Sequence, residues 1–485
     1  MMDMSGKRFL CWDRKLIEKS EGVEVYSHKP EKKNIALFCD DEWEGPHNGY
    51  ASVVNTGDSL RIYYRACAMR QRCDGTLNYA KGVICVAESR DGGMTFQKPN
   101  LGKYEYNGTK NNNIVFMREK DIDNFSVFYD TNPSCPEDER FKALSEINLG
   151  SDNGGTKLIY YASTDGYAFR EMRYLDVKGT FDSYNVTFWD EKTERYFLYY
   201  RAFHSADGTD KLSWRGMKKD DIRDIRVATS KDFVNWDIHG RISFEEGKED
   251  YPLYTNQITK YYRSRDTFIG FPVRYFDREA DKENFRFMPL ADRREKITEF
   301  FGREGTALTD CVVMTSSDGF TFDRRDEAFM TAGPESRSNW WYGNCYTVYG
   351  LTETKAEENG APNEISFYMG ENYRIKNVNF RRYTLRLDGF FSWRAPYRGG
   401  EALTKPITVS AEEMRVNFST SAAGGITVSI CGENGKELDG YESYVIFGDS
   451  TDRPVTFGKP LSELSGKSVR LRFKMKDANL YSFVI

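Results

Sequence analysis

Apolar and aromatic residues gather in short runs along most of the chain, and segments rich in Gly, Asn, Asp and Pro separate these runs. Val, Ile, Tyr and Phe dominate the runs, which is typical of β-strands joined by tight turns. Five of the runs share one more feature: an aspartate-containing turn follows each of them. These five read VICVAES, LIYYAS, IRVATS, CVVMTS and RYTLRL. The pattern predicts an all-β protein.

The turn after these runs is an internal repeat. Its first copy, residues 88–96, reads ESRDGGMTF. The other copies are STDGYAF (163–169), SKDFVNW (230–236), SSDGFTF (316–322) and LDGFFSW (387–393). The form is similar to the Asp box of sialidase propellers, S-x-D-x-G-x-[TW]. A catalytic residue is needed once but a turn residue in every repeat, so the aspartates are expected to hold hairpins by accepting backbone hydrogen bonds. They are Asp91, Asp165, Asp232, Asp318 and Asp388.

A second marker precedes each turn, namely an asparagine that opens another strand-like run. The five asparagines are Asn48, Asn124, Asn185, Asn256 and Asn344. A third run lies between the two markers, as in LRIYYRAC and YFLYYRAF. Five units of at least three strands each predict a five-bladed β-propeller over residues 35–396. The aspartate turns should share one face, so a ligand site is expected on the opposite face, over the central channel.

The two ends of the chain lack the repeat. After the Gly- and Pro-rich joint APYRGGEALTKP, alternating runs such as EEMRVNFSTS and KSVRLRFKMK predict a β-sandwich over residues 397–485. Residues 1–34 carry no marker and are expected to form a lead-in along the outside of the propeller.

Composition and charge limit the classes of molecule that the protein is expected to bind. A formal net charge of −5 argues against nucleic acid and anionic membranes, and no apolar run is long enough for a membrane helix. The N-terminus has no signal-peptide pattern, so a soluble, cytoplasmic protein is expected. The nine cysteines contain no C-x-x-C, and the four histidines form no zinc motif. Neither a metal nor another cofactor is predicted.

Acidic residues lie just before three of the marker asparagines. Glu44 precedes Asn48 by four residues, Asp123 is adjacent to Asn124, and Asp182 precedes Asn185 by three. First strands converge on a propeller axis, so these carboxylates are expected to face one pocket. Glycosidic cleavage needs such carboxylates, one protonated to donate to the leaving oxygen and one ionised as base or nucleophile. Alternatively, each carboxylate caps a loop or faces solvent.

The ends of the second strands and the starts of the third strands carry a further polar ring. Arginine forks and carboxylates suit the hydroxyl or acid groups of a sugar, although they also suit salt bridges between blades. The predicted substrate-binding residues are Arg65, Arg201, Asp224, Arg226, Arg274 and Asp310, with Trp341 as a stacking platform. Glu146 belongs to the same ring. Glu371, which ends a second strand, is the reserve catalytic acid.

The segment Glu44-Gly45-Pro46 followed by GYASVVNTGDSLRIYYRA resembles the arabinanase-type segment that bears a catalytic acid. The five-bladed arrangement with a trailing sandwich resembles the glycoside hydrolases of the invertase/inulinase and arabinanase/xylosidase group. That resemblance implies a carbohydrate substrate. It also implies that Glu44 is the acid, that Asp182 is the base or nucleophile, and that Asp123 tunes the pKa of the acid and orients the substrate.

The sequence therefore predicts a glycoside hydrolase that uses carboxylate acid–base chemistry in the central propeller pocket. One alternative is a sialidase-like hydrolase, in which Arg65, Arg201 and Arg274 hold a carboxylate of the substrate. The other alternative is a propeller that binds carbohydrate without cleaving it.

Overall fold

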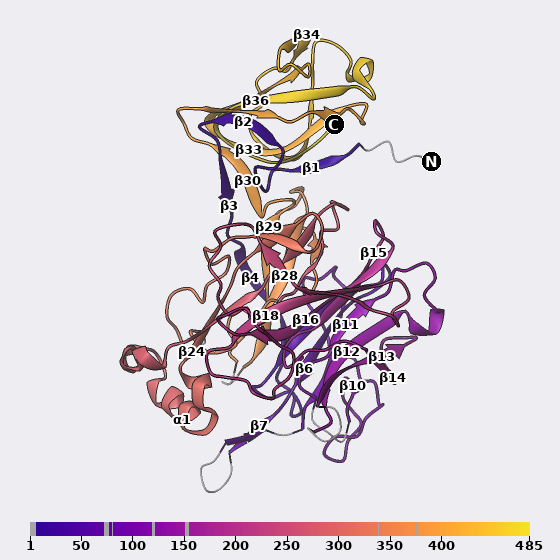
Figure 1. The fold of residues 1–485 in the computed structure, drawn as a ribbon, viewed down its shortest axis with the longest axis vertical. Helices are drawn as coiled ribbons and strands as arrows, with labels where there is room; N and C mark the ends of the chain where they lie inside the picture. Colours follow the sequence, from indigo (N-terminus) through magenta and orange to yellow (C-terminus); the bar gives the residue numbers. More distant parts are fainter. Residues whose placement is uncertain are drawn as a thin grey trace.

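The computed structural model describes residues 6–71, 77–79, 81–118, 122–150, 155–337, 339–373 and 377–485. Strands dominate this part of the chain, and five antiparallel sheets follow one another in sequence order as the blades of a propeller (Figure 1). The predicted all-β class and the blade number are confirmed. Within the described residues, no helix combines the length and the apolar character that crossing a membrane requires.

The first three blades each use four strands, which follow in chain order from the axis outward. Blade 1 contains β5 (Gly49–Asn55), β6 (Leu60–Ala66), β9 (Val83–Ser89) and β10 (Ile114–Phe116). Blade 2 contains β11 (Ser126–Tyr129), β12 (Phe141–Asn148), β13 (Thr156–Ser163) and β14 (Arg170–Tyr174). Blade 3 contains β15 (Val186–Asp190), β16 (Arg195–His204), β18 (Ile222–Ser230) and β19 (Asp237–Arg241).

Blade 4 is built from interrupted strands. It contains β21 (Thr259–Lys260), β22 (Phe268–Gly270), β25 (Met314–Ser316) and β26 (Thr321–Arg324), with β20 (Ser243–Phe244) added in parallel. Its second and third strands continue as the pair β23 (Val273–Asp277) and β24 (Ala307–Cys311). Between them lie η3 (Glu279–Phe287), α1 (Ala291–Phe301) and η4 (Gly302–Gly305). Smaller additions are the hairpin β7 (Met69–Gln71) with β8 (Leu77–Tyr79), the strand β17 (Asp210–Lys211) and the turn η1 (Glu137–Glu139).

Blade 5 is closed by the beginning of the chain. It contains β27 (Thr352–Thr354), β28 (Glu364–Glu371) and β29 (Asn379–Arg386), and its outer strand is β4 (Glu31–Phe38). Asn379 pairs with Phe38 and Thr384 with Glu31. One sheet thus joins both ends of the propeller, which ties its first segment to its last blade.

The strands before β4 pair with the C-terminal region rather than running along the outside of the propeller. Each of them adds to a late strand: β1 (Arg8–Leu10) pairs with β36 (Ser468–Val484), β2 (Ile17–Glu21) with β31 (Gly400–Thr404), and β3 (Glu24–Ser27) with β30 (Phe391–Ala395). Figure 1 shows β3 and β30 together in the connection between the propeller and the C-terminal region.

The C-terminal region is one connected sheet of ten strands around its own hydrophobic core. Its long strands β33 (Met414–Cys431) and β36 pair along most of their lengths, with an interruption between Thr420 and Gly425. The other strands are β32 (Ile407–Thr408), β34 (Glu437–Glu442) and β35 (Asp449–Val455), and η5 (Leu461–Leu464) precedes β36. How the halves of the long strands face each other as a β-sandwich stays a prediction.

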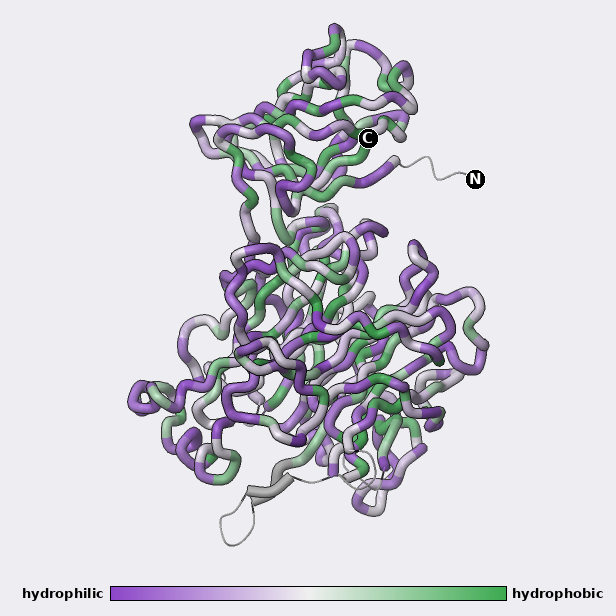
Figure 2. Tube along the Cα trace, in the orientation of Figure 1, coloured by the Kyte–Doolittle hydropathy of each residue, from purple (hydrophilic) through white to green (hydrophobic). Residues whose placement is uncertain are grey.

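Neighbouring blades pack face to face, and the middle strands are therefore buried on both sides. This packing explains why runs such as YFLYYRAF are continuously apolar instead of alternating. Figure 2 shows hydrophobic segments running through the interior of both the propeller and the C-terminal region, with hydrophilic loops around them.

Four of the five aspartate turns have the predicted structure. Asp165 Oδ1 accepts hydrogen bonds from the backbone N–H groups of Tyr167 and Ala168, at 2.8 and 3.3 Å, in the hairpin between β13 and β14. Asp91, Asp232 and Asp318 accept equivalent bonds in blades 1, 3 and 4.

The prediction is wrong for Asp388. This residue follows β29, but the next strand, β30, leaves the blade for the C-terminal sheet. Asp388 is fully buried at that junction, where its carboxylate binds Arg8 and Arg263. Blade 5 takes β4 as its outer strand, so no hairpin is formed there.

Candidate functional site

A cavity of about 140 Å³ opens at the axis on the face opposite the aspartate turns. The starts of first strands and the ends of second strands surround it, as predicted from the blade pattern. Its lining residues are His47, Asn48, Gly49, Tyr50, Arg65, Asp123, Tyr254, Arg303, Glu304, Tyr342, Tyr346 and Tyr373. Arg303 and Glu304 belong to η4, so the insertion in blade 4 forms part of the rim.

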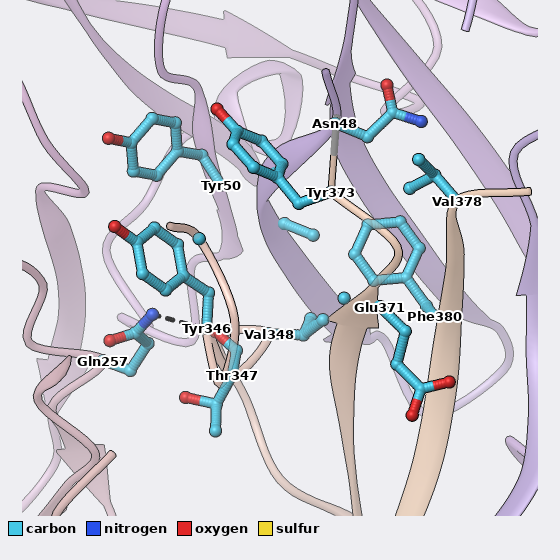
Figure 3. A pocket seen from close by; sticks show the side chains of 14 residues that line it. Asn48, Tyr50, Gln257, Tyr346, Thr347, Val348, Glu371, Tyr373, Val378 and Phe380 are labelled. Atoms are coloured by element: carbon cyan, nitrogen blue, oxygen red, sulfur yellow. Dashed lines mark hydrogen bonds between the residues drawn. The ribbon is translucent and has the colours of Figure 1, made fainter. Parts of the chain in front are cut away.

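A narrow extension of this cavity, about 20 Å³, lies between blades 1 and 5. Figure 3 shows the rings of Tyr50, Tyr346 and Tyr373 around it. Gln257 closes one side, because its side-chain N–H group donates to the carbonyl oxygen of Thr347 at 2.8 Å. The walls are therefore aromatic rings with a few polar groups, a composition common in sites for small ligands.

Backbone strain accompanies this face. Tyr50, Phe181, Gln257 and Cys345 have φ angles of 45°, 56°, 40° and 61°, in the left-handed region that side chains disfavour. Each lies within a few residues of a marker asparagine, at the start of a different blade. Strained backbone of this kind is concentrated at functional sites, because only strong surrounding contacts maintain it.

Glu146, at the end of β12, is the acid most perturbed by its surroundings. Burial raises the pKa of its carboxyl group, and the negative charges of Asp123 and Asp182 raise it further, to about 9. Arg118 and Arg201 oppose this shift only in part. One carboxyl oxygen, Oε2, is sealed from solvent and has no hydrogen-bond partner among the described residues. Glu146 is therefore a neutral acid at pH 7, held beside two aspartates.

Each of the two aspartates lies beside an arginine. Asp123 is 3.6 Å from a terminal nitrogen of Arg65, and its side chain is 46% exposed. Asp182 is 3.4 Å from a terminal nitrogen of Arg201, and its side chain is 23% exposed. Partial access to water and a neighbouring guanidinium are surroundings that suit a carboxylate anion.

The ends of the second strands explain this convergence. The side chains of Arg65, Glu146 and Arg201 occupy equivalent positions in blades 1 to 3, and each reaches toward the next blade. Arg65 donates from Nε to the carbonyl oxygen of Ile122 at 2.8 Å, just before Asp123. Arg201 donates to the carbonyl oxygen of Tyr254, which opens blade 4. The residues that end one blade's second strand thus meet the residues that begin the next blade.

The predicted position of Glu44 is wrong. Its side chain is fully buried inside blade 1 and does not line the cavity. It accepts hydrogen bonds from the Tyr64 hydroxyl and from the backbone N–H of Asp41, and it forms an ion pair of 2.7 Å with Lys98. Burial raises the pKa of Glu44 and Lys98 opposes that rise. These bonds hold Glu44 in a local structural role.

Lys98 neutralises a group of three carboxylates that includes Glu44. Its ammonium group lies 2.8 Å from Asp40, 2.9 Å from Asp41 and 2.7 Å from Glu44. These three carboxylates lie close enough together to hold a cation. The ammonium group of Lys98 is that cation.

Glu371 reaches the narrow extension, but its charge is compensated. Its carboxylate lies 2.7 Å from both Lys32 and Arg381. In Figure 3 this carboxylate lies on the opposite side of the view from the hydroxyls of Tyr50, Tyr346 and Tyr373. Two cationic side chains hold this carboxylate, so Glu371 does not fit the expected role of reserve acid.

Of the seven predicted substrate-binding residues, Arg65 lines the cavity, and Arg201 lies behind it against the lining residue Tyr254. Arg274 instead forms a two-pronged ion pair with Asp310, with nitrogen-to-oxygen distances of 2.7 and 2.6 Å, because the two residues face each other across β23 and β24. Trp341 is 2% exposed and packs against the guanidinium of Arg294 at 4.4 Å.

Asp224 and Arg226 bind each other on the far face of blade 3. The distance between Arg226 Nη2 and Asp224 Oδ2 is 2.9 Å, and Asp210 and His204 complete the network. The register between β16 and β18 places Arg201 and Arg223 on the opposite face. Asp224 and Arg226 therefore lie on the face of blade 3 that is turned away from the cavity, one residue out of register with Arg223.

Two residues that line the cavity, His47 and Arg303, and the nearby Glu146 were not predicted to act there. Glu146 belonged to the second-strand ring, but its neutral state depends on neighbours from two other blades. His47 precedes its asparagine directly, as Asp123 does, and its Nδ1 lies 3.1 Å from Arg65. Arg303 lies in an insertion without any repeat marker, so no pattern pointed to it.

Comparisons with known proteins give only distant resemblances. No protein-family model and no curated protein matches the chain. A solved glycoside hydrolase is 11% identical with a TM-score of 0.44, over 74% of this chain and 92% of that one. An N-acetylgalactosamine deacetylase from F. plautii is 10% identical with a TM-score of 0.43, over 93% and 95% of the two chains.

A β-fructofuranosidase of glycoside hydrolase family 32 from Bombyx mori is also similar. It is 8% identical with a TM-score of 0.39, over 94% of this chain and 93% of that one. At such identities and TM-scores, these resemblances carry no inference about the activity of this chain.

Proposed function

We propose that this protein is a glycoside hydrolase whose proton donor is Glu146. The observation that carries the proposal is a neutral carboxylic acid, Glu146, beside two aspartates, of which Asp123 lines an aromatic axial cavity. Glycosidic cleavage needs this combination, because one carboxyl group must donate a proton while another acts as an anion.

In the proposed reaction, Glu146 donates its proton to the glycosidic oxygen as the bond from that oxygen to the sugar breaks. Asp182 then acts as the base that activates water or as the nucleophile that attacks the sugar carbon. Asp123 orients the substrate and, through its charge, keeps the pKa of Glu146 high. Water supplies the hydroxyl group of the new sugar end and restores the proton to Glu146, so that atoms and charge balance.

The tyrosines of the cavity supply the remaining requirement, a surface for a sugar ring. Tyr254 and Tyr342 are joined by a hydrogen bond of 2.7 Å between their hydroxyls. Aromatic rings pack against the apolar faces of sugars, and their hydroxyls can bind sugar hydroxyls. These roles replace the stacking role expected of Trp341.

A panel of aryl glycosides and oligosaccharides, assayed for released sugar, tests the proposal. We expect wild type to hydrolyse at least one member, and Glu146→Gln to lose at least about 100-fold in kcat, the low end for a general acid. Glu371→Gln is the matched control, because it changes another glutamate near the end of a second strand, one whose carboxylate is already ion-paired. Glu44→Gln should leave turnover of the folded fraction unchanged.

Binding of a sugar without any hydrolysis, in wild type, would contradict the proposal in favour of a non-catalytic carbohydrate-binding propeller. Equal losses in Glu146→Gln and Glu371→Gln would contradict the assignment of the proton donor.

A further inference from the structure

Three arginines from two blades converge beside the axial cavity, around Tyr254 and Tyr275. The guanidinium carbon of Arg201 lies 4.7 Å from the centre of the Tyr254 ring. Those of Arg223 and Arg303 lie 4.4 and 5.0 Å from the centre of the Tyr275 ring. Phe203 separates Arg201 from Arg223 on the same face of blade 3.

Two of these three positive charges have no negative partner within the described part of the chain. No described carboxylate lies within 4.0 Å of a side-chain nitrogen of Arg223 or Arg303, whereas Arg201 has Asp182. The side chain of Arg223 makes no hydrogen bond to any described residue, and its Nε is sealed from solvent. Other arginines of the propeller, such as Arg226 and Arg274, are fully paired.

This arrangement is energetically costly unless something compensates it. Burial and the nearby charges of Arg201 and Arg303 lower the pKa of Arg223. Contacts with aromatic rings offset part of the cost of burying a cation, and Arg303 also has the Tyr275 hydroxyl as a hydrogen-bond partner, but the buried Nε–H of Arg223 stays unsatisfied. An oxyanion would satisfy both the charge and the donors, because guanidinium groups bind such groups through paired hydrogen bonds.

The cluster is accessible from the cavity. Arg303 and Tyr254 both line the cavity, beside Asp123. Arg223 also borders a second cavity of about 130 Å³ between blades 3 and 4. Two of the three acids there are engaged elsewhere, since Asp250 binds His204 at 2.7 Å and Asp224 binds Arg226; the third, Glu249, forms no described ion pair with Arg223.

We propose that Arg223 and Arg303, with Arg201, form a subsite for an oxyanion next to the catalytic carboxylates. The anion is either the carboxylate of an acidic sugar or free inorganic phosphate. The inference rests on the proposed function, which it deepens: the substrate class becomes glycosides of acidic sugars if the anion belongs to the sugar. It differs from the arginine set expected from the sequence, because Arg274 is bound to Asp310 and Arg65 lies with His47.

Isothermal titration calorimetry on the full chain tests the subsite. The probes are D-glucuronate, D-galacturonate and N-acetylneuraminate, with D-glucose and D-galactose as neutral counterparts, and inorganic phosphate. We expect at least one acid, or phosphate, to bind at least about tenfold more tightly than the neutral sugars. Binding of acids identifies the sugar as the source of the anion, and binding of phosphate alone identifies free phosphate.

The variants Arg223→Gln and Arg303→Gln should each weaken that binding at least about tenfold. Arg195→Gln is the matched control, because Arg195 is another arginine of blade 3, at the opposite end of β16 from Arg201, and pairs with Asp237 at 2.7 Å. Far-ultraviolet circular dichroism checks that each variant is folded. Anions that bind no better than neutral sugars, or equally well in both variants, would overturn the subsite.

The two proposals fail separately. Anion binding that depends on Arg223, in a protein that hydrolyses no glycoside, would keep the subsite and overturn the hydrolase. Hydrolysis of neutral glycosides that depends on Glu146, without anion binding, would keep the hydrolase and overturn the subsite.

Discussion

Glu146 and Glu371 both lie near the ends of second strands, yet their surroundings differ in charge. Glu371 has Lys32 and Arg381 at 2.7 Å, whereas Glu146 has the negative charges of Asp123 and Asp182. The same residue type is therefore ion-paired by two cations in blade 5 and a neutral acid beside two aspartates in blade 2. Neighbours from other blades decide the chemistry.

The raised pKa of Glu146 predicts a pH dependence of stability. Between the ordinary glutamate pKa and about 9, folded protein holds a proton that unfolded protein has released. The free energy of unfolding should therefore fall as pH rises through this window, by at most about 1.4 kcal/mol per pH unit from this group. Glu146→Gln removes this contribution, so its stability relative to wild type should increase with pH.

Urea unfolding at several pH values between about 5 and 9 measures this difference. Glu371→Gln serves as the control. A stability difference between Glu146→Gln and wild type that stays constant over this range would contradict the neutral state of Glu146.

At the residue scale, the predicted residues Asp123 and Arg65 line the cavity, whereas Glu44 does not. The reason is Lys98, which lies 54 residues further along the chain and pairs with Glu44 inside blade 1. A pattern of acids before first strands carries no information about such a partner. The cluster of Arg223 and Arg303 could not be predicted either. The face on which Arg223 lies depends on the exact register between β16 and β18, and Arg303 lies in an insertion without a repeat marker.

The aspartate turns belong to the element scale, where local sequence is most informative. Asp165→Ala removes the acceptor for the N–H groups of Tyr167 and Ala168. We expect a loss of about 0.5–2 kcal/mol in the free energy of unfolding, as for other lost caps, and unchanged kcat in the folded fraction. Chemical denaturation and the hydrolysis assay measure the two effects. A lower kcat in fully folded protein would contradict the structural role of this turn.

The insertion between β23 and β24 is the second element-scale feature. Asp277 and Ala307 face each other across that pair, so residues 278–306 are replaceable by a two-residue Asn-Gly turn. The shortened protein should keep the β-rich circular dichroism spectrum of the propeller. It should lose at least about tenfold in anion affinity, because Arg303 is removed.

Arg303→Gln is the control that separates the charge from the rest of the insertion. Unchanged anion affinity in the shortened protein would show that η4 contributes nothing to the subsite.

The elements themselves were largely predictable, because the two markers report local turns and strand starts. The features that could not be predicted depend on contacts between residues far apart in the sequence. The outer strand of blade 5 comes from β4, more than 300 residues before its partner β29. α1 was missed because its sequence, ADRREKITEFF, lies inside an unmarked stretch of a chain that otherwise predicts strands.

At the scale of the whole molecule, Asp388 joins the propeller to the C-terminal sheet. Its buried carboxylate binds Arg263 of blade 4 at 2.8 Å, Arg8 of β1 at 3.1 Å and the hydroxyl of Ser482 in β36 at 2.6 Å. These residues come from parts of the chain that are far apart in sequence. Their convergence holds both ends of the chain against the last blade.

Asp388→Asn should therefore be strongly destabilising, by about 3–5 kcal/mol, because it leaves two arginines without their anion. Arg263 and Arg8 lower the pKa of Asp388 against the effect of burial. The stability from this group is thus present above the ordinary aspartate pKa and is lost as pH falls through the lowered value. Thermal unfolding of the variant at pH 7 measures the loss.

Asp449→Asn is the control, because that carboxylate is mostly exposed and pairs with Arg386 at the surface. A change of less than about 1 kcal/mol in Asp388→Asn, no larger than an exposed pair gives, would contradict the central role of this junction.

The dependence of kcat/KM on the acidity of the leaving group tests the central claim most directly. A proton donor matters most when the leaving oxygen is basic and least when it departs readily as an anion. For Glu146→Gln we predict little loss with a dinitrophenyl glycoside and a loss of at least about 100-fold with an alkyl glycoside of the same sugar. An equal loss with both leaving groups, or the graded loss in Glu371→Gln instead, would contradict Glu146 as the proton donor.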